Sequence, residues 1–344
     1  MTSDRKAGLR IISAGPGATL QDAGRHGYLR YGITAAGPMD PLAHATANLA
    51  LGNPPGATAI EVSIGGIELA AESTPLTIAV VGGEFAIHVD NRLLPSGAVV
   101  ATLEPGTVLK IRPGQSGAWC YVAVAGEFVL PQILGSHATH ARTGIGGIDG
   151  RAIRADDRLH VDVADRSALP LARIAAPWLD RPPGIVRVVL GPQDDFFDQR
   201  QIAVFRDGPW TVSGRADRMA FYLDGPTLTH ARGYNIVSDG IAMGAIQVPG
   251  NGRPIVLMAD RQSTGGYPKF ATVIGPDLGR LAQTRAGTPF RFEIVSVEEA
   301  VAARRAEAAS LAQGVVVEPL VRSEFSPEFL LGLNLIDGFL AAGD

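Results

Sequence analysis

The sequence predicts a mainly β protein with two strand-rich domains, a few short helices and a helical tail at the C-terminus. Two observations support this prediction. The 42 glycines and 24 prolines of the 344-residue chain imply many turns, and short runs rich in valine and isoleucine recur between these turns. The segment 168–184 contains four prolines, interrupts the pattern and is predicted to be a linker. The domains are therefore expected at 1–167 and 185–297, with the tail at 298–344.

The first domain is expected to be a closed or sandwich-like β-structure. Its short strands are predicted at 9–12, 60–64, 77–81, 85–89, 98–103, 108–111, 118–125 and 158–163. One helix is predicted after Met39, because Asp40 is a natural N-cap and Pro41 suits the first helical position. Asn48 in this helix and Glu61 in the next strand are candidates for a shared polar site. The alternative is that they lie at the helix surface and at the strand entry.

The second domain is expected to begin with a strand at 185–190 and to end with one at 290–295. Between them, strands at 245–248 and 255–259 flank Pro-Gly-Asn-Gly-Arg-Pro, which predicts an antiparallel hairpin. A helix is predicted from Val297 to about Gln313, because Ser296 can cap it and acidic residues occupy its first turn. Another short helix is predicted from Ser326, and its apolar residues are expected to pack on this domain or on another subunit.

The composition argues against several classes of protein. The net charge of −4, without a basic stripe, argues against nucleic-acid binding. No apolar stretch is long enough to span a bilayer, so a cytoplasmic protein is expected. The single cysteine, Cys120, is expected to be a buried small hydrophobe. His137 and His140 have the spacing of metal ligands, but no carboxylate or cysteine lies close to them in sequence, so no metal is expected. No P-loop spacing is present either.

The functional site is predicted where the second strand of the hairpin ends. Between Asp260 and Lys269 the chain carries a carboxylate, a guanidinium, an amide, two hydroxyls, a phenol and an ammonium, beside Gly265 and Gly266. Strand ends with polar and glycine residues are common places for sites, and glycine permits close approach of a ligand to the backbone. Lys269 is one of three lysines, against 27 arginines, which favours a specific role. The alternative is that these charges cap a barrel rim.

Several motifs occur in the order typical of a known family. They are Gln21-Asp22-x-Gly24-Arg25-x-Gly27, Gly37-x-Met39-Asp40, Ala47-Asn48, Gly52-Asn53, Gly135-Ser136, Asp217-Arg218-Met219, Ser238-Asp239-Gly240-Ile241, Gly244-x-Ile246-Gln247-Val248-Pro249 and Asp260-Arg261-Gln262-x-Thr264-Gly265-Gly266-Tyr267-Pro268. Between about residues 10 and 295, the chain thus resembles the KipA/allophanate hydrolase subunit 2 family. That family includes the C subunit of 5-oxoprolinase (PxpC) and is related to the carboxyltransferase half of urea carboxylase. Where relatives usually carry Gly-Ser-Arg-Ser-Thr, this chain has His137 in place of the arginine.

The resemblance implies two cyclophilin-like β-barrel units and a partner of the KipI/allophanate hydrolase subunit 1 (PxpB-like) type. In the 5-oxoprolinase branch, the B and C subunits act with a metal-dependent, PxpA-like subunit to open 5-oxo-L-proline to L-glutamate. The chain is therefore expected to be a hydrolase subunit that acts on a small cyclic amide, with ATP used by the complex and no metal in this chain.

Two alternatives remain open. One is a biotin-dependent carboxyltransferase that acts on urea or a related amide, as in the urea amidolyase branch. The other is a KipA-like regulatory binding subunit. The absence of a biotin-carrier Met-Lys-Met sequence from this chain favours the 5-oxoprolinase branch, although a separate carrier protein would keep the carboxyltransferase alternative open.

Both enzyme branches must hold an amide-like group while negative charge develops on its oxygen. Asp260 is the candidate acid, base or orienting carboxylate, and Lys269 and Tyr267 complete the predicted catalytic set. Backbone N–H groups at Gly265 and Gly266 are expected to help bind an anion. The remaining predicted substrate-binding residues are Gln247, Gln262, Thr264, Arg218, Arg261, Gln21, Asp22, Arg25, Asp40 and Asn48.

Overall fold

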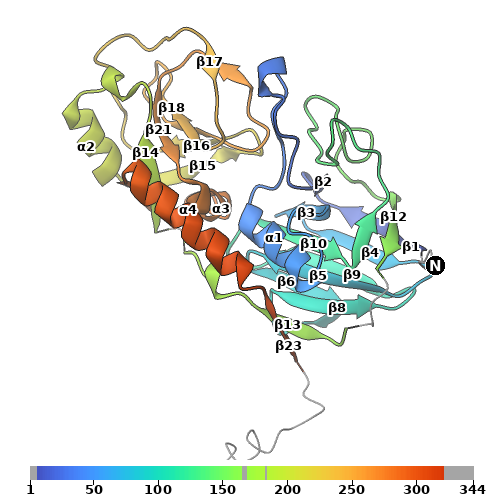
Figure 1. The fold of residues 1–344 in the computed structure, drawn as a ribbon. Coiled ribbons are helices and arrows are strands. Elements are labelled where there is room, and N and C mark those ends of the chain that lie inside the picture. The colour runs from blue at the N-terminus through green and yellow to red at the C-terminus, as the bar shows by residue number, and fades with distance from the viewer. Residues whose placement is uncertain (1–5, 165–168, 183, 321–344) are drawn as a thin grey trace, which may run out of the picture.

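Strands dominate the computed structural model, which describes residues 6–164, 169–182 and 184–320 (Figure 1). The first half forms two seven-stranded sheets, one of which is completed by a strand from the end of the described chain. The first sheet has the order β11 (Gly126–Phe128), β12 (Arg158–Val163), β1 (Lys6–Ala14), β4 (Ile67–Ala71), β9 (Val108–Pro113), β6 (Phe85–Val89) and β7 (Arg92–Leu93). The second has the order β2 (Thr19–Gln21), β3 (Ala59–Ser63), β10 (Trp119–Val124), β5 (Leu76–Gly82), β8 (Val99–Leu103), β13 (Ala172–Ala175) and β23 (Val316–Pro319).

The two sheets share one apolar core because side chains alternate along each strand. In β10, Cys120, Val122 and Val124 contribute to the core cluster that also contains residues of the first sheet. The intervening Tyr121 and Ala123 belong to a separate cluster on the opposite face. Burial raises the pKa of the Cys120 thiol, in keeping with its prediction as a small buried hydrophobe.

The predicted helix after Met39 is confirmed as α1 (Pro41–Ala50). Asp40 caps it, and its carboxylate accepts a hydrogen bond from the Ala43 amide at 3.2 Å. Small residues of α1, including Ala43 and Ala47, pack against the outer face of the second sheet. This packing fixes the position of Asp40 beside β10.

The second half is a closed seven-stranded barrel, in the order β14 (Ile185–Leu190), β21 (Lys269–Val273), β18 (Ala245–Gln247), β19 (Ile255–Leu257), β16 (Ala220–Asp224), β15 (Trp210–Ala216) and β22 (Pro289–Ile294). The predicted hairpin is confirmed, since β18 and β19 pair antiparallel with Ile246 opposite Val256. The core is aromatic, and the Phe205 ring stacks on Phe292 with their centroids 4.5 Å apart. The mainly β class is thus confirmed. The first half is organised as two stacked sheets, the sandwich-like form predicted from its strands.

The remaining elements are short helices and a small ribbon. They are α2 (Gln199–Asp207), α3 (Gly275–Ala282), the 3-10 turns η1 (Leu29–Tyr31), η2 (Pro177–Leu179) and η3 (Asp194–Phe196), and the ribbon of β17 (Asp239–Gly240) and β20 (Thr264–Gly265). The predicted helix after Ser296 is confirmed as α4 (Val297–Ala312), which begins with a capping box between Ser296 and Glu299. No helix in the described ranges is long and apolar enough to cross a membrane.

Parts of the predicted linker and tail form strands instead. Within 168–184, β13 pairs with β8, and β23 follows α4 and pairs with β13. The prolines of the linker predict an irregular segment, but residues 172–175 form a strand because β8 offers an edge. The domain boundaries at 167 and 185 stay predictions. The helix predicted from Ser326 lies outside the described residues.

Side chains that follow α3 join the two halves. The Gln283 carbonyl oxygen accepts hydrogen bonds from the amides of Ala118 and Trp119 at 2.9 and 3.0 Å, and its amide group donates to Asp40 at 3.0 Å. Trp119 and Met39, both from the first half, belong to the core cluster of the barrel. The candidate site is therefore built across a packed seam.

Candidate functional site

Arg218 is the centre of a buried polar network that crosses this seam. Its guanidinium donates to both carboxylate oxygens of Asp260 at 2.8 Å each and to the Gly37 carbonyl at 2.9 Å. It also forms an ion pair with Glu61 of β3. Burial alone would lower the pKa of Arg218, but the charges of Glu61 and Asp260 outweigh it and raise that pKa. The arginine is therefore a fixed cation between two carboxylates.

Glu61 extends the network toward α1. One of its carboxylate oxygens accepts hydrogen bonds from the Tyr121 hydroxyl and the Met39 amide, each at 2.8 Å. The Tyr121 hydroxyl in turn accepts from the Asp40 amide at 2.7 Å. Burial raises the pKa of Glu61, and Arg218, the Met39 amide and Tyr121 oppose that rise. The polar role suggested for Glu61 is thus real, and its partners come from three separate segments.

Arg25 and His140 lie close enough to Asp260 for its charge to affect both. Burial lowers the pKa of each side chain, and the Asp260 carboxylate opposes this in both cases. Arg25 donates to the Ala138 carbonyl, but its buried Nη1 has no partner among the described residues. The His140 Nδ1 also lacks a partner there, while its Nε2 contacts the Thr34 hydroxyl at 3.0 Å. Buried polar atoms without partners are costly, so they commonly mark sites with a further role.

Lys269, the first residue of β21, belongs to a second polar cluster, beside the ribbon of β17 and β20. Its ammonium pairs with Asp239 and approaches the Gly240 carbonyl oxygen at 3.4 Å. The Lys269 side chain is 7% exposed and that of Asp239 is 60% exposed. The hydrogen bond from Lys269 lowers the pKa of Asp239. The cation is therefore mostly buried, while its counter-ion reaches solvent.

Gln247 faces this cluster and has an amide group without a partner. In the ladder between β18 and β21 it lies opposite Lys269, and it is 2% exposed. Its Nε2 is buried and makes no hydrogen bond to any residue that the structure describes. Gly265 lies directly against it, because a Cβ at this glycine would come within 2.6 Å of Nε2. The two N–H groups of the Gln247 amide therefore lie beside the Gly265 backbone, without a hydrogen-bond partner among the described residues.

The rest of the predicted polar run is spread over the rim. Arg261 donates to the Ile241 carbonyl at 2.8 Å, and burial lowers its pKa. Gln262 and Thr264 are exposed, and Tyr267 is 40% exposed. The Gly266 carbonyl accepts from the Ile236 amide at 2.8 Å. The polar run from Asp260 to Lys269 is therefore divided between two clusters. Asp260 belongs to the Arg218 network, whereas Lys269 pairs with Asp239.

Four predicted residues of the first half support loops and the seam. Asp22 accepts from the Ser136 hydroxyl and the His137 amide, each at 2.6 Å, and so holds the turn at His137. Gln21 donates to the Thr139 carbonyl at 3.0 Å. Asn48 donates to the Ala57 carbonyl at 2.9 Å and lies away from the network. Asp40 pairs with Arg181 at 2.7 Å.

Asn48 is 0% exposed, so the alternative of a helix-surface position is wrong; its amide donates to the carbonyls of His44 and Ala57 and not to Glu61. No group of three or more His, Cys, Asp or Glu side chains within the described ranges could hold a metal ion. Sequence reasoning missed Tyr121 and Gln283. The only sequence signal for Tyr121 is a single phenol inside the apolar run of β10. No sequence signal points to Gln283.

The comparisons with known proteins identify the family. The family described as "Carboxyltransferase domain, subdomain A and B" matches residues 31–294, and the chain belongs to it. The chain is similar to the C subunit of 5-oxoprolinase from Haemophilus influenzae, with 38% identity over 300 residues, 86% of this chain and 94% of the relative. It is also 36% identical to the C subunit of 5-oxoprolinase from Escherichia coli, over 86% of this chain and 94% of the relative. The predicted family resemblance is confirmed.

Longer proteins contain a similar region. A putative urea carboxylase of Emericella nidulans is 28% identical over 87% of this chain, which spans 25% of that relative. Among solved structures, the crystal structure of TTHA0988 matches with a TM-score of 0.74 and 32% identity, covering 83% of this chain and 55% of the other. The Kluyveromyces lactis urea carboxylase matches with a TM-score of 0.82 and 25% identity, covering 91% of this chain and 30% of the other.

Proposed function

We propose that this chain is the C subunit of a heteromeric, ATP-dependent 5-oxoprolinase that converts 5-oxo-L-proline to L-glutamate. One observation carries the proposal: two relatives named as the C subunit of 5-oxoprolinase align over 94% of their length at 38% and 36% identity. In this reaction water adds across the ring amide, so its carbon becomes a carboxylate and its nitrogen an amine. Hydrolysis of ATP to ADP and phosphate by the complex would drive the step.

The Lys269 cluster supplies the groups that an amide substrate requires. Negative charge develops on the amide oxygen during C–N cleavage, and fixed donors at that position stabilise it. The unpartnered Gln247 amide group faces Gly265, and the Lys269 ammonium lies on the neighbouring strand. Gln247 and Lys269 would bind the amide oxygen or the substrate carboxylate, and Tyr267 on the rim would close the pocket.

The geometry favours an orienting role for Asp260 over an acid–base role. Both of its oxygens already accept hydrogen bonds from Arg218, so a proton transfer would have to break that pair. Asp260 would hold Arg218 and, through its charge, Arg25 and His140 in position at the seam. Arg25 and His140, each with an unpartnered nitrogen, are the groups of this network that would face a ligand or a partner loop.

The proposal includes partners. The chain would act with a KipI/allophanate hydrolase subunit 1 (PxpB-like) protein and with a PxpA-like, metal-dependent subunit. Both relatives are named as one subunit of a larger enzyme, which supports a multi-subunit complex.

The test is reconstitution of the complex. The chain is co-expressed with candidate B and A subunits, and ATP-dependent formation of glutamate from 5-oxoproline is measured. Turnover should require all three chains. Lys269→Met should reduce it by about 100-fold or more, the usual effect of losing one oxyanion-stabilising group. Lys110→Met is the matched control, because Lys110 lies 37% exposed in an ion pair with Glu68, far along the first sheet. Equal turnover in both variants would remove Lys269 from the mechanism.

A carboxyltransferase is the second candidate. The family itself is described as a carboxyltransferase domain, and urea carboxylase of K. lactis shares the fold with a TM-score of 0.82. If a well-formed complex leaves 5-oxoproline unchanged, carboxybiotin with urea or related amides is the next assay. Transfer of the carboxyl group there would replace the first proposal, and failure of both assays would favour a KipA-like regulatory subunit.

A further inference from the structure

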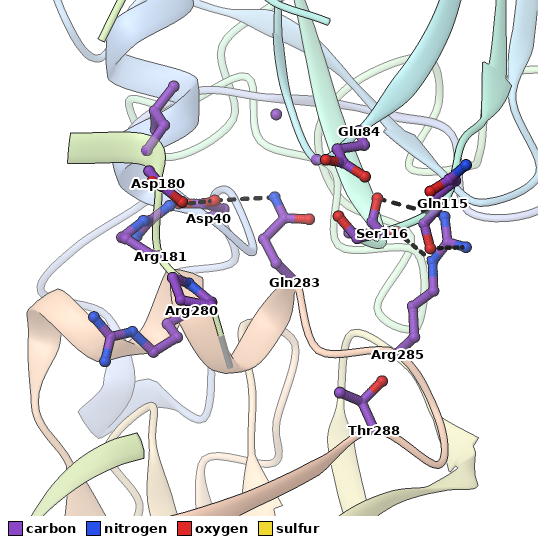
Figure 2. Close-up of a pocket in the computed structure, with 15 residues that line it drawn as sticks. Asp40, Glu84, Gln115, Ser116, Asp180, Arg181, Arg280, Gln283, Arg285 and Thr288 are labelled. Carbon is purple, nitrogen blue, oxygen red and sulfur yellow. Dashed lines mark hydrogen bonds and ion pairs between the residues drawn. The ribbon is translucent and has the colours of Figure 1, made fainter. Parts of the chain in front are cut away.

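Two pockets of similar volume differ in the groups that line them. The pocket on the seam, of about 530 Å³, is lined by three arginines and three carboxylates, among them the pair of Arg181 and Asp40 (Figure 2). Those charges balance one another. The second pocket, of about 520 Å³, has a mainly aliphatic lining in which Arg92 and Glu104 are the charged residues. It lies between the β6–β7 turn on one side and β8 with Leu169–Leu171 on the other, and we call it the edge groove.

The edge groove opens into the apolar core between the two sheets. Leu94, in its wall, is a buried member of the core cluster, and the half-buried Val89 and Leu171 pack against that cluster. Leu169 on the rim is 38% exposed. Each Å² of apolar surface left in water forgoes about 25 cal/mol of stabilisation, and contiguous exposed apolar surface commonly marks a contact. The groove is therefore a place where the core is incompletely covered by the described residues.

The described chain ends at the rim of this groove. Strand β23 pairs with β13 at the lower edge of the second sheet (Figure 1). The Leu320 amide, directly after β23, donates to the carbonyl of Leu171 at 3.0 Å, and Leu171 lines the groove. Phe329 follows Leu320 by nine positions, and nine extended residues span about 30 Å. The residues after 320 thus begin beside the groove and can reach all of it.

The segment 326–340 has the composition of a core element. Its apolar residues include Phe329, Leu330, Leu333, Ile336 and Leu340, and its charged residues are two acids. In the helix predicted from Ser326, those five side chains would share one face. A tail that stays solvated is instead typically poor in apolar residues and rich in charge. This composition favours burial of the segment against an apolar surface.

We propose that residues 326–340 dock in the edge groove of the same chain and complete the core at that end of the two sheets. The groove is apolar, opens into the core and borders the point from which the segment leaves the described chain. Tethering also gives the segment an effective concentration of about a millimolar, an advantage that a separate partner lacks. The inference concerns the chain itself and does not depend on the substrate of the complex.

The test is disulfide trapping in the full chain. The background is clean, because the single cysteine, Cys120, is 0% exposed. Asn334→Cys in the segment is combined either with Glu104→Cys, in the groove, or with the control Arg173→Cys. Glu104 and Arg173 are both exposed; Arg173 lies on β13, the strand beside the chain exit, and does not line the groove.

Thiol–disulfide exchange in a glutathione buffer gives the effective concentration of each cysteine pair. We expect the value for the Glu104→Cys pair to exceed that for the Arg173→Cys pair at least about tenfold, because docking holds the segment at the groove while the exit point alone favours β13. Equal values, or a larger value for the Arg173→Cys pair, would overturn the proposal.

A double substitution tests whether apolar burial holds the segment. Leu330→Asp with Leu333→Asp should lower the Glu104→Cys value at least about tenfold and leave the Arg173→Cys value within about twofold. Near-ultraviolet circular dichroism checks that the fold is kept. An unchanged Glu104→Cys value would overturn the proposal. Disulfide-linked dimers whose share rises with protein concentration would do the same, because they would assign the groove to a second copy of the chain.

Discussion

Replacing Arg218 by methionine should strongly destabilise the fold. The substitution keeps most of the side-chain length but removes the guanidinium that neutralises Glu61 and Asp260. The two carboxylate side chains are 0% and 8% exposed, so water cannot replace the lost charge. The Gly37 carbonyl loses its donor as well.

The magnitude follows from this geometry. Removal of one partner of a buried ion pair costs about 3–5 kcal/mol of unfolding free energy. Two stranded carboxylates place the loss at or above the upper end of that range. Protonation limits it, because neutralising one carboxylate with an ordinary pKa near 4 costs about 4 kcal/mol at pH 7. We therefore expect a loss of about 5–8 kcal/mol at pH 7. The difference in unfolding free energy between Arg218→Met and the unchanged protein should become smaller as the pH falls. The change should be about 1.4 kcal/mol per pH unit for each carboxylate that takes up a proton in the folded state.

Urea unfolding followed by tryptophan fluorescence measures the effect. Arg253→Met is the matched control, since Arg253 pairs with Asp224 at 3.2 Å while the two side chains are 63% and 55% exposed, and exposed pairs contribute about 0–1 kcal/mol. Adding Glu61→Gln and Asp260→Asn to Arg218→Met should recover stability, because no buried charge remains. A loss no larger than that of Arg253→Met, or a triple variant less stable than the single one, would refute the reasoning.

Three further predictions concern stability and turnover. Burial lowers the pKa of His44 to about 4. The neutral side chain therefore contributes up to about 3 kcal/mol to the free energy of unfolding; this contribution is fully present above the usual pKa of about 6.5 and is lost as the pH falls toward 4. In urea unfolding, His44→Gln should flatten that part of the pH profile, and the exposed His160→Gln should not. Gly265→Ala places a Cβ 2.6 Å from the Gln247 amide nitrogen and should reduce turnover of the complex by about 100-fold, whereas Gly233→Ala, with nothing within 4 Å, should leave it unchanged. Ser296→Ala removes the cap of α4 and should cost about 1 kcal/mol in thermal unfolding; an unchanged midpoint would contradict the capping role.

Local signals predicted the elements that depend on local chemistry. The caps at Asp40 and Ser296 lead directly to α1 and α4, and the Asn-Gly turn leads to the β18–β19 hairpin. Helix α3 was missed because its sequence contains two glycines and a proline. It forms because tertiary contacts hold it: the Asp277 carboxylate accepts hydrogen bonds from the Arg187 amide and guanidinium, at 2.7 to 3.0 Å.

The sequence by itself determined the family, the mainly β class and the polar run that contains Asp260 and Lys269. Sequence reasoning treated that run as one site, and only the tertiary structure separates the two residues: Asp260 binds Arg218, while Lys269 binds Asp239. Glu61 and Arg218 are 157 positions apart in sequence, so their pairing has no local signal. The physical reason is that turns and caps are satisfied by neighbouring residues, whereas a buried charge is satisfied by whichever segment the packing of sheets brings beside it.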